Sequence, residues 1–226
     1  MTANGLPEEW ERLRVAFENN RRFTADAAHE LRTPLAGVKV NSQVALLSKD
    51  NRSRDAALHE VISSVNSATQ LVEQLLMLSR LDPEADVVGE EVVDLKVIAA
   101  DSIAELAHQA LEKHIEISLD ADKAMSVAGR GQMLSILIRN IVGNAIQYTP
   151  HNGVIAISIE ETLNRIRLRV ADSGPGIPES EYSAVFRRFH RGKDNDVPGT
   201  GLGLSIVNRI VEIHHGEIIL GRSEHH

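Results

Sequence analysis

Two long amphipathic helical patterns in succession most constrain the fold of this chain. From Glu8 onward no glycine or proline appears before Pro34, and apolar or small residues recur every three or four positions. A second pattern of the same period follows a polar, turn-like segment over residues 48–55, and Asp82-Pro83 should end it. We therefore predict an antiparallel helical hairpin. Its two apolar stripes consist of Ala28, Leu31, Leu35, Val38, Ser42, Ala45 and Leu46, and of Leu58, Ile62, Val65, Thr69, Val72 and Leu76.

Both stripes are too wide for one helix–helix contact to cover. A hairpin on its own would leave apolar surface in water, and dimerisation into a four-helix bundle would bury it. Packing of the hairpin against the rest of its own chain is the alternative. The pattern leaves both possibilities open.

An acidic connector containing proline and glycine, over residues 82–91, separates the hairpin from a region of alternating helices and strands. This order predicts an α/β sandwich with helices on one face of a mixed sheet. The irregular residues 172–201 have the length of a functional lid. We predict helices over residues 95–113, 132–147 and 204–214, and strands over residues 92–94, 115–119, 126–128, 154–159, 166–170 and 217–220.

The composition excludes several classes of protein. With 42% hydrophobic and 25% charged residues, the 226-residue chain should fold into globular domains. The absence of cysteine excludes disulfides, thiolate zinc sites and iron–sulfur clusters, and the net charge of −8 argues against nucleic-acid binding. No apolar run is long enough to span a membrane. We expect a soluble, cytoplasmic polypeptide that could be the inner portion of a longer membrane protein.

A possible reactive histidine lies in the segment FTADAAHELRTPL. At about 100° per residue, His29 should face solvent, with Thr33 one turn further along the same face. Glu30 could accept a hydrogen bond from one ring nitrogen and leave the other as a neutral nucleophile, and Pro34 should bend the helix. The segment fits an imidazole that takes and gives a transferable group. On these residues alone, however, a plain exposed histidine on a kinked helix is the simpler interpretation.

Three further segments, with a basic segment between the second and the third, could form a nucleotide-binding site. Asn140 and Asn144 lie one helical turn apart and offer amide oxygens to a Mg²⁺ ion held by phosphates. In DSGPGI (residues 172–177) a carboxylate could receive an adenine amino group, and GTGLGL (199–204) leads into a helix, as in polyphosphate sites. FRRFHR (186–191) could supply cations to the phosphates. Each segment alone could be a polar helix edge, a common turn or a basic surface loop.

The motifs HELRTP, NxxxNA, DSGPGI, FRRF and GTGLGL, in this order, resemble the sensor histidine kinases of two-component signalling. The resemblance covers nearly the whole chain, from about residue 23 to residue 220. It implies an α+β multidomain protein, in which a hairpin forming a dimeric four-helix bundle precedes an α/β sandwich of the Bergerat (GHKL) ATP-binding fold. The implied domains are a helical linker from an upstream signal-transmitting region (1–22), the dimerisation and histidine-phosphotransfer hairpin (23–82), an interdomain linker (83–91) and the catalytic domain (92–226), which would lack its last strand.

The resemblance also implies roles for individual residues. His29 would accept the phosphoryl group, Glu30 would be its acid–base partner, and Thr33 would position the water that dephosphorylates a response regulator. Asn144 would bind Mg²⁺, Asp172 the adenine amine and Arg191 a phosphate. The residues implied in nucleotide binding are Asn140, Asn144, Tyr148, Asp172, Gly174, Gly176, Ile177, Arg191, Gly199, Thr200, Gly201, Leu202 and Gly203.

The function implied by the resemblance is that of an ATP- and Mg²⁺-dependent protein-histidine autokinase. It would work as a homodimer, pass the phosphoryl group to an aspartate on the receiver domain of a response regulator, and also dephosphorylate that regulator. Neither nucleic-acid binding nor direct membrane insertion is expected. The parent protein would be a sensor of the inner membrane, with this chain on the cytoplasmic side.

The chain departs from the family pattern in three places. Gln147 stands where Lys or Arg is usual, Arg187 stands where an acidic residue is common, and the family has one more strand after residues 217–220. Two other functions remain alternatives. One is a clamp ATPase of the same fold, which would need a glutamate where Asn140 stands. The other is a non-catalytic dimeric adaptor whose shape is set by nucleotide.

Overall fold

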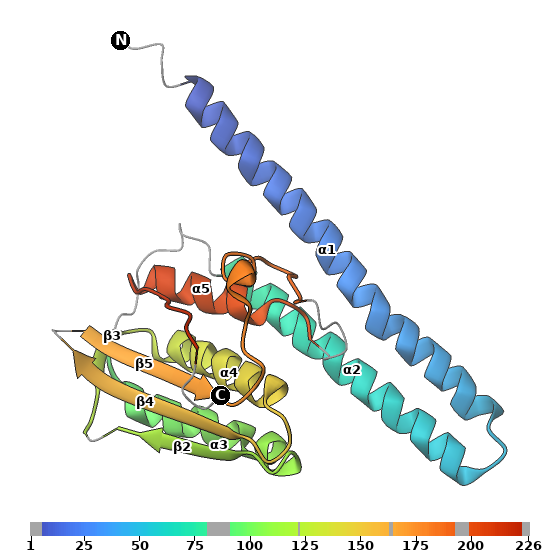
Figure 1. Cartoon of the computed structure of the whole chain (residues 1–226). Helices are drawn as coiled ribbons and strands as arrows, with labels where there is room; N and C mark the ends of the chain where they lie inside the picture. Colours follow the sequence, from blue (N-terminus) through green and yellow to red (C-terminus); the bar gives the residue numbers. More distant parts are fainter. Residues whose placement is uncertain (1–5, 81–90, 122, 163–164, 193–198, 223–226) are drawn as a thin grey trace. The chain divides into compact units, whose positions relative to one another are not determined.

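The computed structural model describes residues 6–80, 91–121, 123–162, 165–192 and 199–222 (Figure 1). It divides into two compact units, Met1–Ser79 and Arg80–His226. We call the first the hairpin unit and the second the α/β unit, and describe each by itself.

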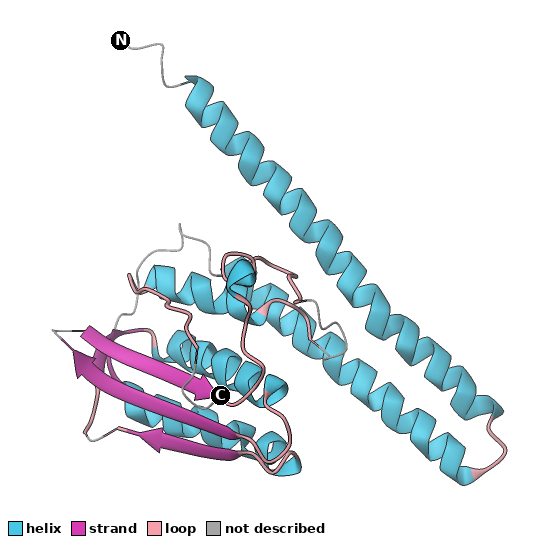
Figure 2. Ribbon diagram, viewed as in Figure 1, coloured by secondary structure: helices cyan, strands magenta, loops and turns pink. Residues whose placement is uncertain are grey.

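Two long helices form the hairpin unit, α1 (Leu6–Leu47) and α2 (Asn51–Arg80) (Figure 2). α1 continues through Pro34 without a break, so the predicted linker, from residue 6 onward, and the first arm of the hairpin are one helix. The turn is shorter than predicted. α2 already begins at Asn51, because the Asp50 carboxylate accepts a hydrogen bond from the Ser53 N–H at 2.8 Å and satisfies the first turn of the helix.

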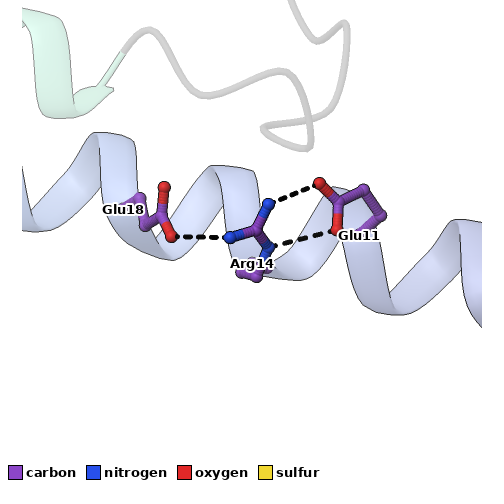
Figure 3. Close-up of polar contacts among 3 residues, drawn as sticks. All are labelled: Glu11, Arg14 and Glu18. Carbon is purple, nitrogen blue, oxygen red and sulfur yellow. Dashed lines mark hydrogen bonds and ion pairs between the residues drawn. The ribbon is translucent and has the colours of Figure 1, made fainter.

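Local ion pairs support the N-terminal part of α1. The Arg14 guanidinium contacts Glu11 at 2.7 Å and Glu18 at 3.2 Å, one turn away in each direction (Figure 3). All three side chains are more than half exposed, so water and salt screen these contacts. They favour the helical conformation of this segment without providing it with a core.

The two helices of the hairpin pack closely through small residues. A Cβ atom added to Gly37 of α1 would lie 3.0 Å from the Ser64 hydroxyl of α2. Ala45 and Ala57, near the turn, are buried. In contrast, the large apolar members of the second predicted stripe are all more than 40% exposed: Leu58, Ile62, Val65, Val72 and Leu76. The hairpin unit therefore carries one apolar seam within itself and a second, exposed apolar face.

The α/β unit contains two small sheets. In the three-stranded sheet, β4 (Val154–Thr162) lies between β2 (Glu116–Asp120), which is parallel to it, and β5 (Arg165–Asp172), which is antiparallel. The second sheet pairs β1 (Glu91–Asp94) with β3 (Ser126–Gly129) in antiparallel fashion. β4 and β5 are consecutive strands of this sheet, and their pairing places Ile157 opposite Val170.

Three α-helices cover one face of the three-stranded sheet (Figure 1). They are α3 (Leu95–Glu112), α4 (Gly131–Tyr148) and α5 (Gly203–Ile213). Alternate residues of β4 are fully buried, and so is one side of α4 and of α5, as the predicted sandwich requires. The core consists mainly of Ile138, Val142, Ile155, Ile157, Ile159, Ile206 and Ile210.

Two predictions at the edges of the α/β unit are wrong. Residues 217–220 were expected to be a strand, but the structure assigns no strand there. A strand needs a neighbour for its backbone hydrogen bonds, and among the described strands the sheet ends at β5. Glu91, predicted to belong to the connector, starts β1 because it pairs with Gly129; residues 83–90 lie outside the described part. No described helix has the length and apolar character needed to cross a membrane.

Candidate functional site

His29 is an exposed side chain in the middle of α1, as the helical pattern predicts. Thr33, one turn further on, is also exposed, and Glu30 is half-buried. No hydrogen bond joins His29 to Glu30 within the described part of the chain. The imidazole is therefore accessible to a reactant, and the acid–base role of Glu30 remains a prediction.

In the α/β unit, the start of α5 lies directly against the two asparagines of α4. The Asn140 amide nitrogen donates to the Ile136 carbonyl at 2.8 Å, which fixes the orientation of its carboxamide. A Cβ on Gly203 would lie 3.1 Å from the Asn140 Oδ1 and 3.4 Å from the Asn144 Nδ2. Glycine at the first position of α5 is what permits this approach. Two segments separated by about sixty residues in the sequence thus form one wall of a site.

Asp172, at the end of β5, begins a tight turn that lies against the C-terminal end of α4. Its Oδ1 accepts a hydrogen bond from the Gly174 N–H at 2.8 Å. A Cβ on Gly174 would lie 2.7 Å from that same oxygen and 2.9 Å from the Tyr148 carbonyl oxygen, so only glycine fits there. A carboxylate has lone pairs for several donors, so Asp172 can accept a further hydrogen bond from a ligand amine.

A lysine that sequence reasoning missed supports this end of α4. The Lys113 ammonium donates to three carbonyl oxygens, of Ile146 at 2.8 Å, of Gln147 at 2.7 Å and of Thr149 at 3.2 Å. These carbonyls are at the negative end of the helix dipole and lack helical partners, so a cation stabilises them. Lys113 follows α3, more than thirty residues earlier in the chain, and no local signal in the sequence indicates the contact.

The GTGLGL segment also packs against the FRRFHR segment. Gly201 has a positive φ of 66°, and a Cβ there would lie 2.7 Å from the carbonyl carbon of Phe189. Phe189 itself adopts a left-handed φ of 60°. Gly199 lies against Gln147, since its Cβ would be 3.3 Å from the Gln147 Nε2. The two sides of the predicted lid therefore meet; residues 193–198 between them lie outside the described part.

The remaining predicted nucleotide residues lie around these contacts. Gly176 has a φ of 71°, which an L side chain rarely adopts, and Ile177 is half-buried. The Thr200 hydroxyl accepts from the Leu202 N–H at 3.3 Å. Leu202 is completely buried, so its side chain belongs to the core, while Arg191 is exposed.

The structure thus brings together the asparagine, DSGPGI, FRRFHR and GTGLGL segments in the α/β unit, and it places His29, Glu30 and Thr33 in the hairpin unit. Among the described residues, no three His, Cys, Asp or Glu side chains form a cluster that could hold a metal ion by themselves. A cation at the asparagines would need oxygens from a bound ligand or water. Mg²⁺ at polyphosphate sites is coordinated in this way.

Two protein families match the two units. The His kinase A (phospho-acceptor) domain matches residues 19–84. The histidine kinase-, DNA gyrase B- and HSP90-like ATPase family matches residues 129–226, so the α/β unit contains an ATP-binding domain. Both matches agree with the order of domains that the motifs predict.

Individual proteins give the same result. The chain is 45% identical over 213 residues to the sensor protein kinase PmrB of Pseudomonas aeruginosa, covering 94% of this chain and 44% of PmrB. It is 36% identical to the sensor protein QseC of Escherichia coli K12, covering 99% of this chain and 52% of QseC. The chain therefore spans about half the length of these curated relatives.

A solved structure supports the fold. The histidine kinase ThkA, crystallised with the response regulator protein TrrA, is similar over 100% of this chain and 64% of its own, with a TM-score of 0.75. Its sequence identity of 23% supports only the fold. The two domain matches and the sequence relatives support more than the fold: the chain belongs to the sensor histidine kinases.

Proposed function

We propose that this chain transfers the γ-phosphoryl group of ATP to its own His29. The observation that carries the proposal is the exposed imidazole of His29 within the phospho-acceptor domain, in a chain that also contains an ATP-binding domain. An accessible neutral imidazole can attack phosphorus, and positioning and charge neutralisation supply most of the catalysis in phosphoryl transfer. Glu30 is proposed to hold or accept the imidazole proton.

The nucleotide is proposed to bind between the DSGPGI turn and the start of α5. Asp172 would accept the adenine amine, since only one of its oxygens is used by the Gly174 N–H. The amides at the start of α5 would face the phosphates, as at other helix N-termini that bind anions. Arg191 is proposed to contact a phosphate, and Tyr148, which is 44% exposed, to lie beside the base.

Mg²⁺ fits the donor set on α4. Asn144 and Asn140 offer neutral amide oxygens beside Gly203, and the ion would obtain its other ligands from phosphate and water. Bound there, Mg²⁺ would neutralise charge on the phosphates. The Asn140 amide also argues against a clamp ATPase, because an amide cannot take a proton from an attacking water.

The hairpin unit is proposed to dimerise and to dock a response regulator. Its exposed apolar face, which includes Ile62 and Val65, would be buried in a four-helix bundle with a second copy. The phosphoryl group would pass from His29 to an aspartate of the receiver domain. Thr33, exposed one turn from His29, is proposed to position water for the reverse, dephosphorylating activity.

The parent protein is proposed to be a membrane sensor with this chain on its cytoplasmic side. The proposal follows the resemblance to the sensor proteins PmrB and QseC, of which the chain covers about half. We assign residues 1–22 to the helical linker, 23–82 to the phosphotransfer hairpin and 92–226 to catalysis.

The test is incorporation of label from γ-³²P-ATP into His29→Ala, with His59→Ala as the matched control. His59 is also an exposed histidine in the hairpin unit, on α2. We expect an acid-labile, base-stable phosphoadduct in the parent chain and in the control but not in His29→Ala, which should still bind ATP. Label retained by His29→Ala would refute the assignment, and rapid ATP hydrolysis without an adduct would favour the clamp ATPase.

A further inference from the structure

A partly buried contact between Glu181 and His190 joins two segments of the lid. Glu181 is the last residue of a short 3₁₀ helix, η1 (Glu179–Glu181), that follows the DSGPGI turn. Its Oε2 lies 3.6 Å from the His190 Nε2, and the two side chains are 15% and 28% exposed. The His190 Nε2 is buried and has no hydrogen-bond partner among the residues that the structure describes. The Glu181 carboxylate is therefore the group available to pair with a proton on that nitrogen.

The same carboxylate also lies close to the backbone of Gly192, on the other side of Arg191. A Cβ on Gly192 would lie 3.3 Å from the Glu181 Oε2. Glu181 thus lies against both neighbours of Arg191 in the sequence, His190 and Gly192. Because these two residues fix where the chain enters and leaves position 191, the Glu181 carboxylate limits the positions that the Arg191 backbone can adopt.

The turn at His190 is also held from the GTGLGL side. A Cβ on Gly201 would lie 2.8 Å from the His190 carbonyl oxygen, and Phe189 just before it has the left-handed φ of 60°. Backbone in this conformation is unfavourable for a bulky residue and persists only when surrounding contacts enforce it. Gly201 and the Glu181–His190 pair supply such contacts from two directions.

We propose that Glu181 and His190 are positioning residues that hold the Arg191 segment in place for the phosphates of ATP. The inference rests on the proposed kinase function. The 3.6 Å contact with His190 would occupy the Glu181 carboxylate and so reduce its competition with the phosphates for the Arg191 cation. The pair would act through Arg191 and through the turn at Phe189, whereas the base is proposed to bind at Asp172.

The test compares Glu181→Gln and His190→Gln with the control Glu179→Gln, all in the full chain. Glu179 is an exposed carboxylate in the same 3₁₀ helix. Titration calorimetry would measure the affinity for the ATP analogue AMPPNP and for adenosine, which has no phosphates. We expect the first two variants to bind AMPPNP about threefold to fivefold more weakly, the range for a partly exposed charged contact. The adenosine affinity, and both affinities of Glu179→Gln, should be unchanged.

Three further readouts separate positioning from damage to the fold. The KM for ATP in autophosphorylation should rise more than kcat falls, Glu181→Asp should recover part of the affinity, and the double variant should bind AMPPNP no more weakly than either single variant. Equal losses for AMPPNP and adenosine, or AMPPNP affinity equal to that of Glu179→Gln, would overturn the inference. Since binding requires no phosphoryl transfer, these outcomes are distinct from a failure of the parent chain to phosphorylate His29.

Discussion

Ile138, Val142 and Ile206 of the α/β unit are 0% exposed, whereas Leu35 and Ile62 of the hairpin unit are 59% and 58% exposed. The α/β unit is a layered structure, so each apolar face has another element to cover it. Two helices can cover only one face of each other, and the remaining apolar surface of the hairpin unit needs another molecule or domain. The α/β unit should therefore fold by itself, and the stability of the hairpin unit should depend on association.

The largest effect is expected at the exposed face of the hairpin unit. Ile62→Glu should weaken the proposed dimer about a thousandfold, because two-fold symmetry would bury two unpaired carboxylates at the interface. Sedimentation equilibrium measures the change. Leu111→Glu is the control, since Leu111 is 70% exposed on α3 of the α/β unit. If Ile62→Glu dimerises as tightly as Leu111→Glu, this face of α2 is not the interface.

In the core of the α/β unit, Ile206→Ala should lower the free energy of unfolding by about 3 kcal/mol through lost burial and the cavity left behind. Urea titration should give the same loss at every protein concentration, because the residues of this core all belong to the α/β unit itself. Ile219→Ala, at a 77% exposed position, should change the stability by less than about 0.5 kcal/mol. A loss that depended on concentration would contradict the independence of the α/β unit.

Within the α/β unit, alanine substitutions at two glycines should have different effects: one on nucleotide affinity and the other on stability. The Cβ added by Gly203→Ala would press on the Asn140 and Asn144 amides. We therefore expect ATP to bind about tenfold more weakly, a loss of about 1.4 kcal/mol in binding free energy, measured by calorimetry. Gly143→Ala meets nothing within 4 Å and should instead stabilise α4 by about 0.5–1 kcal/mol. Unchanged ATP affinity in Gly203→Ala would mean that the asparagines do not contact the nucleotide.

The smallest effect concerns pH and the hairpin unit. The Ser53 N–H holds the pKa of the Asp50 carboxyl below its ordinary value of 3.8, so the ionised form favours folding. This contribution is present above about pH 4 and is lost as the pH falls through the lowered pKa. Asn at this position still caps α2 but does not titrate. Circular dichroism melts from pH 5 to about pH 2 should therefore show a slightly smaller loss of Tm for Asp50→Asn than for the parent chain. Asp55→Asn, the control, should follow the parent.

Local patterns were sufficient for much of the fold and for the composition of the site. The helical stripes, the β4–β5 alternation and the exposure of His29 follow from the spacing of apolar residues, which depends only on helix and strand geometry. The predictions for the start of β1 and for a strand at residues 217–220 failed for one reason. A strand is defined by its partner, and the Glu91–Gly129 pairing cannot be read from either segment alone.

The sequence by itself determined which chemical groups this protein has: an imidazole on a helix, paired asparagines, a carboxylate in a glycine turn and a glycine-rich helix start. Only the tertiary structure showed that Gly203 lies against Asn140, that Lys113 caps the end of α4 and that Glu181 reaches His190. The physical reason is the distance along the sequence between the residues that interact. Helix and strand periodicity arise from neighbours a few residues apart, whereas these contacts join segments that meet only when the core has closed.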